Sequence, residues 1–339
     1  MEHYFYSIED LNSKSRFDKL IIDKKDKELQ NSSPNLELIF QGKIPFLSFL
    51  EFYEIDTHVN LFFPTIFTNP DFETIHPKEQ SIVQNYRLRR YSSNSGTASG
   101  LNIEDCILHG LLEIIERDSL GVELLKTVIK TNGAQVREIE LETLPLSITE
   151  IIHLALQETN GEIKLYDITS DFGVTTILCS ISYTCNGSFC IFGSGASLWI
   201  TYAIERAILE AIQGFHIQNL YKIPFQQPMN SNLNKMSLYQ RCCLDNGYFR
   251  YRYGMKKINF SDIKSPINQE NRINNQEQIK ILLDILYQHN IKSYFRVIKD
   301  DNVKVVQVLV PKLERFFLVM HGIPVAPSYR GRTILNSTN

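Results

Sequence analysis

A run of small residues, NSGTASG at positions 94–100, stands directly before the longest helical pattern in the chain. From Ile103 to about Lys130, apolar residues recur at intervals of three and four, the spacing of one helix face, and Asn102 is suited to cap the start. Asn132-Gly133 ends the pattern. Because small residues let a backbone approach a ligand closely, this loop before a helix is a candidate binding element.

The order of the other elements favours one α/β domain rather than two. A second long helix, from about 200 to 218, follows another small-residue run, GSGAS at 193–197, which we expect to be a loop. Asn186-Gly187 predicts the turn of a hairpin. The remaining expectations are strands within 36–68, at 163–169, 174–184, 188–195, 292–298 and 304–311, helices at 146–158 and 276–289, a loop at 222–235, and a short helix or loosely held arm at 9–35.

Composition excludes several classes of protein. Hydrophobic residues make up 43% of the 339 and charged residues 22%, which excludes disorder, collagen and coiled coil as the dominant state. A formal net charge of −3 gives no electrostatic signature of a nucleic-acid or membrane-surface protein. The apolar runs are too short to cross a bilayer, and the start of the chain lacks the apolar stretch of a secretory signal. We therefore expect a cytoplasmic protein that binds neither nucleic acid nor a membrane.

The cysteines do not indicate a metal site. None of the six forms a CxxC pair, and Cys242 and Cys243 are adjacent, which suits neither zinc nor an easy disulfide. We expect reduced thiols. A nucleophilic pair of Cys106 and His109 is disfavoured, because the acids nearby raise the pKa of the thiol.

Four polar side chains of the first long helix share one face. On a helical wheel Asp105, His109, Glu113 and Glu116 fall within an arc of roughly 80°. Three acids so placed repel one another unless a positive group lies among them. Two interpretations stay open: a solvated polar face partnered by Arg87 or Arg117, or a divalent-cation site, where hard oxygen ligands favour Mg²⁺ shared with phosphates.

The second long helix shows a related pattern. Arg206, Glu210 and Gln213 fall on one face within roughly 60°, apart from its apolar residues. An ordinary surface helix explains this equally well. Acids on one helix and an arginine on the other, each helix after a small-residue run, nevertheless suit Mg²⁺ with a polyphosphate. GSGAS is not a P-loop, because no GK[ST] follows it.

Four segments, in the same order along the chain, resemble the YcaO domain family. They are SSNSGTASGLNIEDCILHGLLEIIERD at 92–118, LYDITSDFGVTTILCSI at 165–181, GSGASLWITYAIERAILEAIQ at 193–213 and VVQVLVPKLERF at 305–316. The resemblance covers roughly residues 90–330 and implies a YcaO-like α/β fold. It divides the chain into a divergent or truncated N-terminal segment (1–90), a YcaO-like domain (91–330) and a C-terminal tail (331–339).

The resemblance also implies a site for ATP and Mg²⁺. Glu113 and Glu116 would be the Mg²⁺ ligands, and Asp105 and His109 would line the same site. Arg117 would contact phosphate or orient the acids. The remaining implied residues are Arg206 and Glu210 on the far side, Gln213 in support of them, and Asn94 and Ser95 in the loop that approaches the nucleotide.

The implied activity is ATP-dependent activation of peptide backbone amides. The product would be an azoline, made by a cyclodehydratase, or a thioamide, in a ribosomal peptide natural product of the bacteriocin kind. Two alternatives stay open: a scaffold or partner subunit with a weakened ATP site, and an ATP-using enzyme that modifies a ribosomal protein. The implied partners are a peptide substrate, a separate leader-peptide-binding or TfuA-type protein, and a second copy or another subunit in a homodimer or hetero-oligomer.

Two features depart from the family pattern. The family carries a further helix near its N-terminus with a Ser-x-x-x-Glu-x-x-Glu-Arg pattern that supplies more Mg²⁺ ligands. The nearest match here is Ser48, Glu51 and Glu54, one residue short in spacing and within a run that reads better as strand. The azoline-forming branch often ends in a proline-rich tail, whereas this C-terminus has only Pro324 and Pro327. The outcome of the reaction, azoline or thioamide, therefore stays open.

Overall fold

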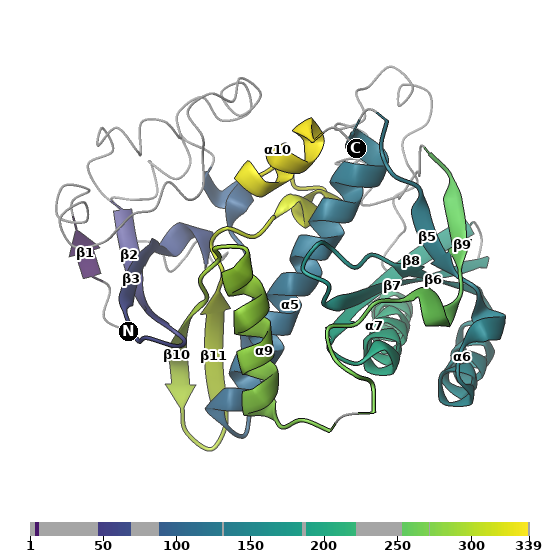
Figure 1. Cartoon of the computed structure of the whole chain (residues 1–339), viewed down its shortest axis with the longest axis horizontal. Coiled ribbons are helices and arrows are strands. Elements are labelled where there is room, and N and C mark those ends of the chain that lie inside the picture. Colours follow the sequence, from purple (N-terminus) through teal and green to yellow (C-terminus); the bar gives the residue numbers. More distant parts are fainter. Residues whose placement is uncertain are drawn as a thin grey trace. The chain divides into compact units, whose positions relative to one another are not determined.

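The computed structural model describes residues 4–6, 47–68, 88–130, 132–184, 188–221, 253–270 and 272–337. The expected arm at 9–35, Arg87, the Asn186-Gly187 turn and the loop at 222–235 lie outside the described residues, as do Cys185, Cys242 and Cys243. Figure 1 shows the elements along the chain.

The chain divides into two compact units, each with a sheet of its own. The order of the elements in the sequence had instead favoured one domain. Element order does not show which strands pair. Strands from both ends of the chain form one sheet and strands from its middle form the other.

The first unit comprises Met1–Ile114, Asn274–Val319 and Ile323–Asn339. Its sheet has the order β1-β2-β10-β11-β4, with β3 also paired to β2, and every pairing is antiparallel. The strands are β1 (Tyr4–Tyr6), β2 (Leu47–Glu54), β3 (Asn60–Pro64), β4 (Thr97–Gly100), β10 (Tyr294–Asp300) and β11 (Lys304–Leu309). The helical elements are α9 (Asn275–Gln288), α10 (Tyr329–Asn336), the first half of α5 (Ile103–Leu124) and the short turns η1 (Thr65–Phe67) and η3 (Leu88–Tyr91). The expectation of strands within 36–68 is thus confirmed for β2 and β3.

The second unit comprises Ile115–Ile273 and Met320–Gly322. Its sheet has the order β8-β7-β6-β5-β9, antiparallel except for the parallel pair β5 and β9. The strands are β5 (Val136–Ile139), β6 (Glu162–Asp167), β7 (Thr175–Thr184), β8 (Ser188–Ser197) and β9 (Met255–Ile258). Helices α6 (Leu146–Thr159) and α7 (Ile200–Tyr221), the second half of α5, the π-helical turn η4 (Leu125–Ile129), and the 3-10 turns η5 (Leu141–Thr143) and η7 (Phe260–Asp262) complete it. The turn η8 (Phe316–His321) runs from the first unit into the second.

Both small-residue runs contain strand that we expected to be loop. Residues 97–100 of the first run form β4, paired with Lys304–Gln307 of β11. The whole of GSGAS in the second run belongs to β8, paired with β7 through Ser197. Glycine is used here for close packing rather than for a turn. A Cβ on Gly193 would collide with the backbone of Ala207 and Ala211 in α7.

One core of the second unit lies where α6 and α7 cover a face of its sheet. Ala203, Ala207 and Ala211 of α7 are fully buried against the glycine side of β8. Ile139, Leu165, Ile177 and Ile181, from three neighbouring strands, fill the same cluster. Because both partners are small, the helix and the strand approach within backbone contact, and the side chains at the start of α7 are fixed relative to β8.

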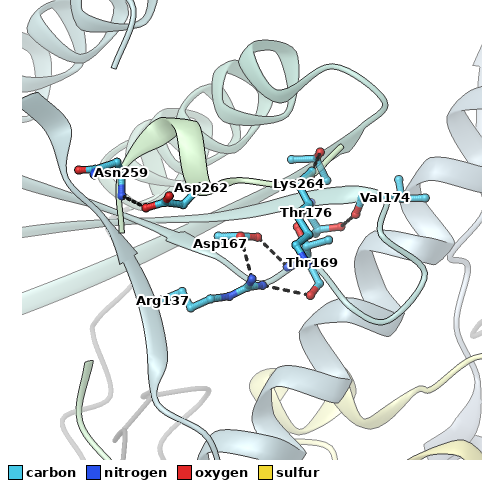
Figure 2. Close-up of polar contacts among 9 residues, drawn as sticks. Arg137, Asp167, Thr169, Val174, Thr176, Asn259, Asp262 and Lys264 are labelled. Carbon is cyan, nitrogen blue, oxygen red and sulfur yellow. Dashed lines mark hydrogen bonds and ion pairs between the residues drawn. The ribbon is translucent and has the colours of Figure 1, made fainter. Parts of the chain in front are cut away.

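The second unit also contains a polar network at the end of β6. Figure 2 shows the Arg137 guanidinium bound to both Asp167 and the carbonyl of Thr169, with Nη1–Oδ2 and Nη2–O distances of 3.2 Å each. The Thr169 amide donates to Asp167 Oδ1 at 3.0 Å, which closes the turn after the strand. Thr176 Oγ1 lies 3.3 Å from Ser119 Oγ of α5, and this hydroxyl contact joins β7 to the second half of α5.

Candidate functional site

In the first unit, the small-residue loop lies against the carboxylate of Glu113. The Gly96 amide donates to Glu113 Oε2 at 3.1 Å. Gly96 has φ +82°, and a Cβ there would collide with the carbonyl oxygen of Val308 and the side chain of Ile114. Gly110 of α5 serves the same close approach, since a Cβ on it would lie 2.7 Å from the Gly96 carbonyl oxygen. Two glycines therefore let the loop and the helix meet where Glu113 lies.

Asn94 and Ser95 occupy this loop as expected. The Asn94 side chain is exposed. The backbone carbonyl of Asn94 accepts from the Thr97 amide at 3.1 Å. Ser95 Oγ lies 2.7 Å from Ser93 Oγ, which also accepts from the Ser95 amide at 3.1 Å. Asn94 and Ser95 thus bond to neighbouring residues of the loop itself.

Asp105 has a structural task. Its amide donates to Asn102 Oδ1, and its carboxylate accepts from the side-chain amides of Asn102 and of Asn275 in α9. Asn102 therefore caps α5 as expected, and Asp105 joins the start of α5 to α9. His109, one turn further along, is exposed.

In the second unit, one serine holds the carboxylates of two helices. Ser194 Oγ donates to Glu116 Oε1 of α5 at 2.6 Å. The Ser194 amide donates to Glu210 Oε2 of α7 at 3.3 Å. Glu116 is only 5% exposed, so the short hydroxyl contact partly compensates for removing its charge from water. Glu116 and Glu210, which the sequence placed on separate helices, therefore meet at one residue of β8.

The other predicted site residues of the second unit are Arg206, Gln213 and Arg117, and they differ in burial and in their neighbours. Arg206 is half-buried one turn before Glu210, and its Cβ lies 2.8 Å from where a Cβ on Gly195 would be. Gln213 is exposed. Burial first, and the charge of Arg117 second, lower the pKa of His321.

Sequence reasoning missed the role of Ser194. The residue was visible within GSGAS, but the run was interpreted as a loop. The signal was the alternation of Gly193 and Gly195 about Ser194 at the end of an apolar strand pattern. Period-two alternation places the glycines on one strand face and the serine on the other.

The segment that comes nearest to the family's additional N-terminal acid helix forms a strand here, and its two glutamates bind other residues. Glu51 and Glu54 lie in β2, where Glu51 accepts from Asn60 Nδ2 at 2.6 Å and Glu54 forms an ion pair with Lys292 at 2.8 Å. Burial works to raise the pKa of Glu54, but hydrogen bonds from Lys292 and Thr57 outweigh it and leave that pKa lowered. The strand interpretation of this segment is confirmed.

Cys106 lacks the features of an activated nucleophile. Its side chain is buried, and Sγ donates to the Lys304 carbonyl at 3.6 Å. Burial first, and the charge of Asp105 second, raise the pKa of the thiol. A raised pKa lowers the thiolate fraction at neutral pH, as the sequence indicated.

The carboxylates suit Mg²⁺ in their chemistry. Mg²⁺ in nucleotide enzymes takes one or two carboxylates and completes its shell with phosphate oxygens and water. Glu113, Glu116 and Glu210 supply such oxygens. Within the described part of the chain, no three His, Cys, Asp or Glu side chains are grouped to hold a metal by themselves.

Among the residues that the structure describes, none of the helices combines the length and apolar composition that a bilayer span requires.

Comparison with known proteins gives the following matches. The family described as YcaO cyclodehydratase, ATP- and Mg²⁺-binding, matches residues 40–314, a range that includes β2 and β3. An uncharacterized protein of Methanothermobacter thermautotrophicus is 26% identical over 258 residues, 73% of this chain and 60% of that protein.

Solved structures share the fold. A heterocyclase in complex with substrate and cofactor aligns with a TM-score of 0.62 at 16% identity, over 92% of this chain and 40% of the heterocyclase. YcaO from Methanopyrus kandleri bound with AMPPCP and Mg²⁺ aligns with a TM-score of 0.57 at 18% identity, over 83% of this chain and 68% of that one. This chain thus spans 60% of the Methanothermobacter relative and 40% of the heterocyclase. The expected α/β fold is confirmed, and because the family match covers most of its length, the chain belongs to the YcaO cyclodehydratase family.

Proposed function

We propose that this chain uses Mg²⁺ and ATP to activate backbone amides of a peptide, as a cyclodehydratase or a thioamide-forming enzyme. The observation that carries the proposal is the set of carboxylates at the small-residue segments. Glu113 accepts from the loop amide of Gly96, and Glu116 and Glu210 meet at Ser194. The family's description as ATP- and Mg²⁺-binding agrees with this chemistry.

Glu113 and Glu116, one turn apart on α5, would be the Mg²⁺ ligands. When bound, Mg²⁺ would neutralise phosphate charge that builds up during phosphoryl transfer. Arg206 supplies a fixed positive charge on the same helix as Glu210, and Arg117 supplies a second one beside Glu116 in the sequence. The amides and hydroxyls of the Asn94–Gly96 loop are suited to donate to a nucleotide, and Asp105 and His109 would line the approach to it.

The reaction needs ATP because an amide oxygen is a poor leaving group. The thiol or hydroxyl of a peptide Cys, Ser or Thr, or a sulfide, adds to the amide carbonyl carbon, and the carbonyl oxygen takes the γ-phosphoryl group of ATP, releasing ADP. Phosphate then departs with that oxygen. With a side-chain nucleophile the amide nitrogen loses its proton and an azoline remains, so the peptide has lost one water. With sulfide the amide nitrogen keeps its proton, the added sulfur loses its own as phosphate leaves, and a thioamide remains.

Mass spectrometry of a peptide co-expressed with the protein tests this proposal. The candidate peptide is a short Cys-, Ser- or Thr-rich precursor encoded beside the gene, in the manner of bacteriocin precursors. Loss of the mass of one water would identify a cyclodehydratase, and exchange of one oxygen for sulfur a thioamide-forming enzyme. A substrate that proves to be a ribosomal protein would favour the alternative modification. An unchanged peptide, with the protein's proper partner present, would contradict the proposal.

A scaffold or partner subunit with a weakened ATP site is the second candidate. The observation in its favour is the segment around β2, where Glu51 and Glu54 bind Asn60 and Lys292. In that case the chain would act within a homodimer or hetero-oligomer, with a leader-peptide-binding or TfuA-type protein recognising the substrate. Nucleotide binding by the chain in the presence of Mg²⁺ separates the two candidates.

A further inference from the structure

The segment Ile323–Ser328, which we call the C-terminal strap, is anchored to the first unit by a buried carboxylate. Glu314 is 2% exposed, and Oε1 accepts from the amides of Arg315 and Phe316 at 2.8 and 2.9 Å. Its Oε2 accepts from Ser328 Oγ at 2.6 Å and from the Ser328 amide at 3.0 Å. Ser328 also caps α10 through the Gly331 amide. The end of the strap therefore has a fixed place.

The strap is also joined to Tyr91, the last residue of η3. The Ala326 amide donates to the Tyr91 hydroxyl oxygen at 3.3 Å. The Tyr91 carbonyl accepts from Arg315 Nη1 at 2.8 Å, and the same nitrogen donates to the Phe67 carbonyl at 3.0 Å. Burial lowers the pKa of the Arg315 guanidinium to about 10, well above neutral, so it keeps its charge and its donors. Tyr91 is thus held at its ring by the strap and at its backbone by Arg315.

Tyr91 leads directly into the loop that meets Glu113. The Ser93 amide donates to the Phe67 carbonyl at 3.3 Å, the acceptor that Arg315 also uses. Ser93 Oγ contacts Ser95, and the next amide, that of Gly96, donates to Glu113. A series of hydrogen bonds, joined through the backbone at Tyr91 and between Ser95 and Gly96, therefore runs within the first unit from the strap to Glu113.

We propose that Tyr91 and Arg315 are positioning residues for nucleotide binding, and that through them the C-terminal strap sets the place of the Ser92–Gly96 loop over Glu113. This proposal rests on the proposed function, because it assumes that the loop and Glu113 bind Mg²⁺-ATP. It adds residues that lie outside the two small-residue segments and their helices. By linkage, nucleotide binding at the loop should in turn steady the strap.

Tyr91→Phe tests the connection with little loss of packing. The ring stays, and the hydroxyl that accepts from the Ala326 amide is removed. We expect the dissociation constant for Mg²⁺ with a non-hydrolysable ATP analogue to rise about 3- to 10-fold, the range of one hydrogen bond. Tyr253→Phe is the matched control, because it removes the hydroxyl that donates to the Lys130 carbonyl at 2.8 Å in the second unit. That variant should bind the analogue as the wild type does.

Amide hydrogen exchange of the wild type provides a second readout that a merely structural role would not move. With Mg²⁺ and the analogue, exchange should slow in the peptide that covers 323–330 as well as in the loop at 92–96. In Tyr91→Phe the loop should still respond and the strap should lose its response. A strap that ignores the analogue while the loop is protected would overturn this inference alone. A wild type that binds no analogue, with its partner present, would overturn the proposed function and this inference with it.

Discussion

Ser194 holds carboxylates from two helices, one with its hydroxyl and one with its amide. Ser194→Ala should separate these contacts, because only the hydroxyl bond to Glu116 is lost. A buried carboxylate that loses a hydrogen bond costs about 1–3 kcal/mol, so the free energy of unfolding should fall by that order. Affinity for Mg²⁺-ATP should fall several-fold as Glu116 loses its fixed orientation. Calorimetric titration and urea unfolding measure the two effects.

The control for that variant is Ser99→Ala, at an exposed position in β4. It should change neither quantity measurably. If Ser194→Ala lowered stability and left nucleotide affinity intact, Ser194 would serve the fold alone.

The sequence predicted which acids share a helix face but not which of them have structural partners. Helix periodicity places Asp105, Glu113 and Glu116 together, since it depends only on spacing. Whether a carboxylate caps a helix or binds a neighbour depends on residues far away in sequence. Asn275, which binds Asp105 from α9, is such a residue, and no local pattern near Asp105 indicates it.

Helix α7 and strand β8 approach within backbone contact, and glycine makes this approach possible. Gly193→Ala would place a methyl group into the backbone of Ala207 and Ala211. Overpacking usually lowers the free energy of unfolding by about 1–3 kcal/mol. Because the methyl group would clash with the backbone of two residues, the loss should reach or exceed the upper end of that range. Thermal or urea unfolding measures the loss.

Gly214→Ala in α7 is the matched control. Its Cβ would meet only the side chain of Ile191, at 2.9 Å, and alanine is the better helix former by about 1 kcal/mol. The two effects oppose each other, so stability should stay within about 1 kcal/mol of wild type. Equal stability of both variants would show that α7 does not lie on β8 as described.

Glu123, in the last turn of α5, makes the second unit sensitive to pH. Burial raises the pKa of Glu123 to about 7, opposed by Lys126 and Arg137 and assisted by Asp167. A raised carboxyl pKa means that the folded state binds more protons than the unfolded state between about pH 4.5 and 7. Stability from this group is therefore present at low pH and is lost as pH rises through 7.

Glu123→Gln should remove that pH dependence. The variant should gain roughly 1–3 kcal/mol over the wild type at pH 8 and much less at pH 5. Unfolding at a series of pH values measures the difference. Exposed Glu150→Gln on α6 is the control, and it should follow the wild type at every pH. A gain for Glu123→Gln that is the same at pH 5 and pH 8 would contradict the assignment.

Elements with regular periodicity were predictable, and those governed by close packing were not. The strand patterns of β6, β7 and β8 and the cap of α5 at Asn102 are local signals, so their positions followed from the sequence. GSGAS was misread because glycine is common in loops. Its actual reason, the approach of Ala207 to Gly193, involves residues of two different elements.

The pairing of strands from both ends of the chain could not be predicted from the sequence. β2 pairs with β10, some 240 residues later, and β4 pairs with β11. The sequence of one strand does not indicate its partner, because an apolar strand pattern fits beside many other strands. The order of the elements and the family resemblance predicted the α/β class, whereas the two sheets are shown only by the structure.

The carboxylates of β2 bear on the proposed binding of nucleotide. A phosphate-bridging Mg²⁺ site usually takes ligands from more than one wall, and Glu51 and Glu54 bind Asn60 and Lys292. We therefore expect weak Mg²⁺-ATP binding and little ATPase activity for the chain alone. A partner chain or self-association should raise the affinity, and nucleotide should strengthen the assembly by the same factor. Titration with and without the products of neighbouring genes measures this; tight binding by the isolated monomer would contradict it.

Binding of Mg²⁺-ATP by the acids of α5 is tested by calorimetric titration into wild type, Glu116→Gln and Glu104→Gln, each with the partner present. Glutamine at 116 keeps an oxygen for the Ser194 hydroxyl but loses the charge that Mg²⁺ requires, whereas Glu104 is exposed on the first turn of the same helix. We expect Mg²⁺-dependent binding by wild type and Glu104→Gln, and at least about tenfold weaker binding by Glu116→Gln, with its thermal stability retained. Equal affinity of all three proteins would show that the acids of α5 do not bind the metal-nucleotide.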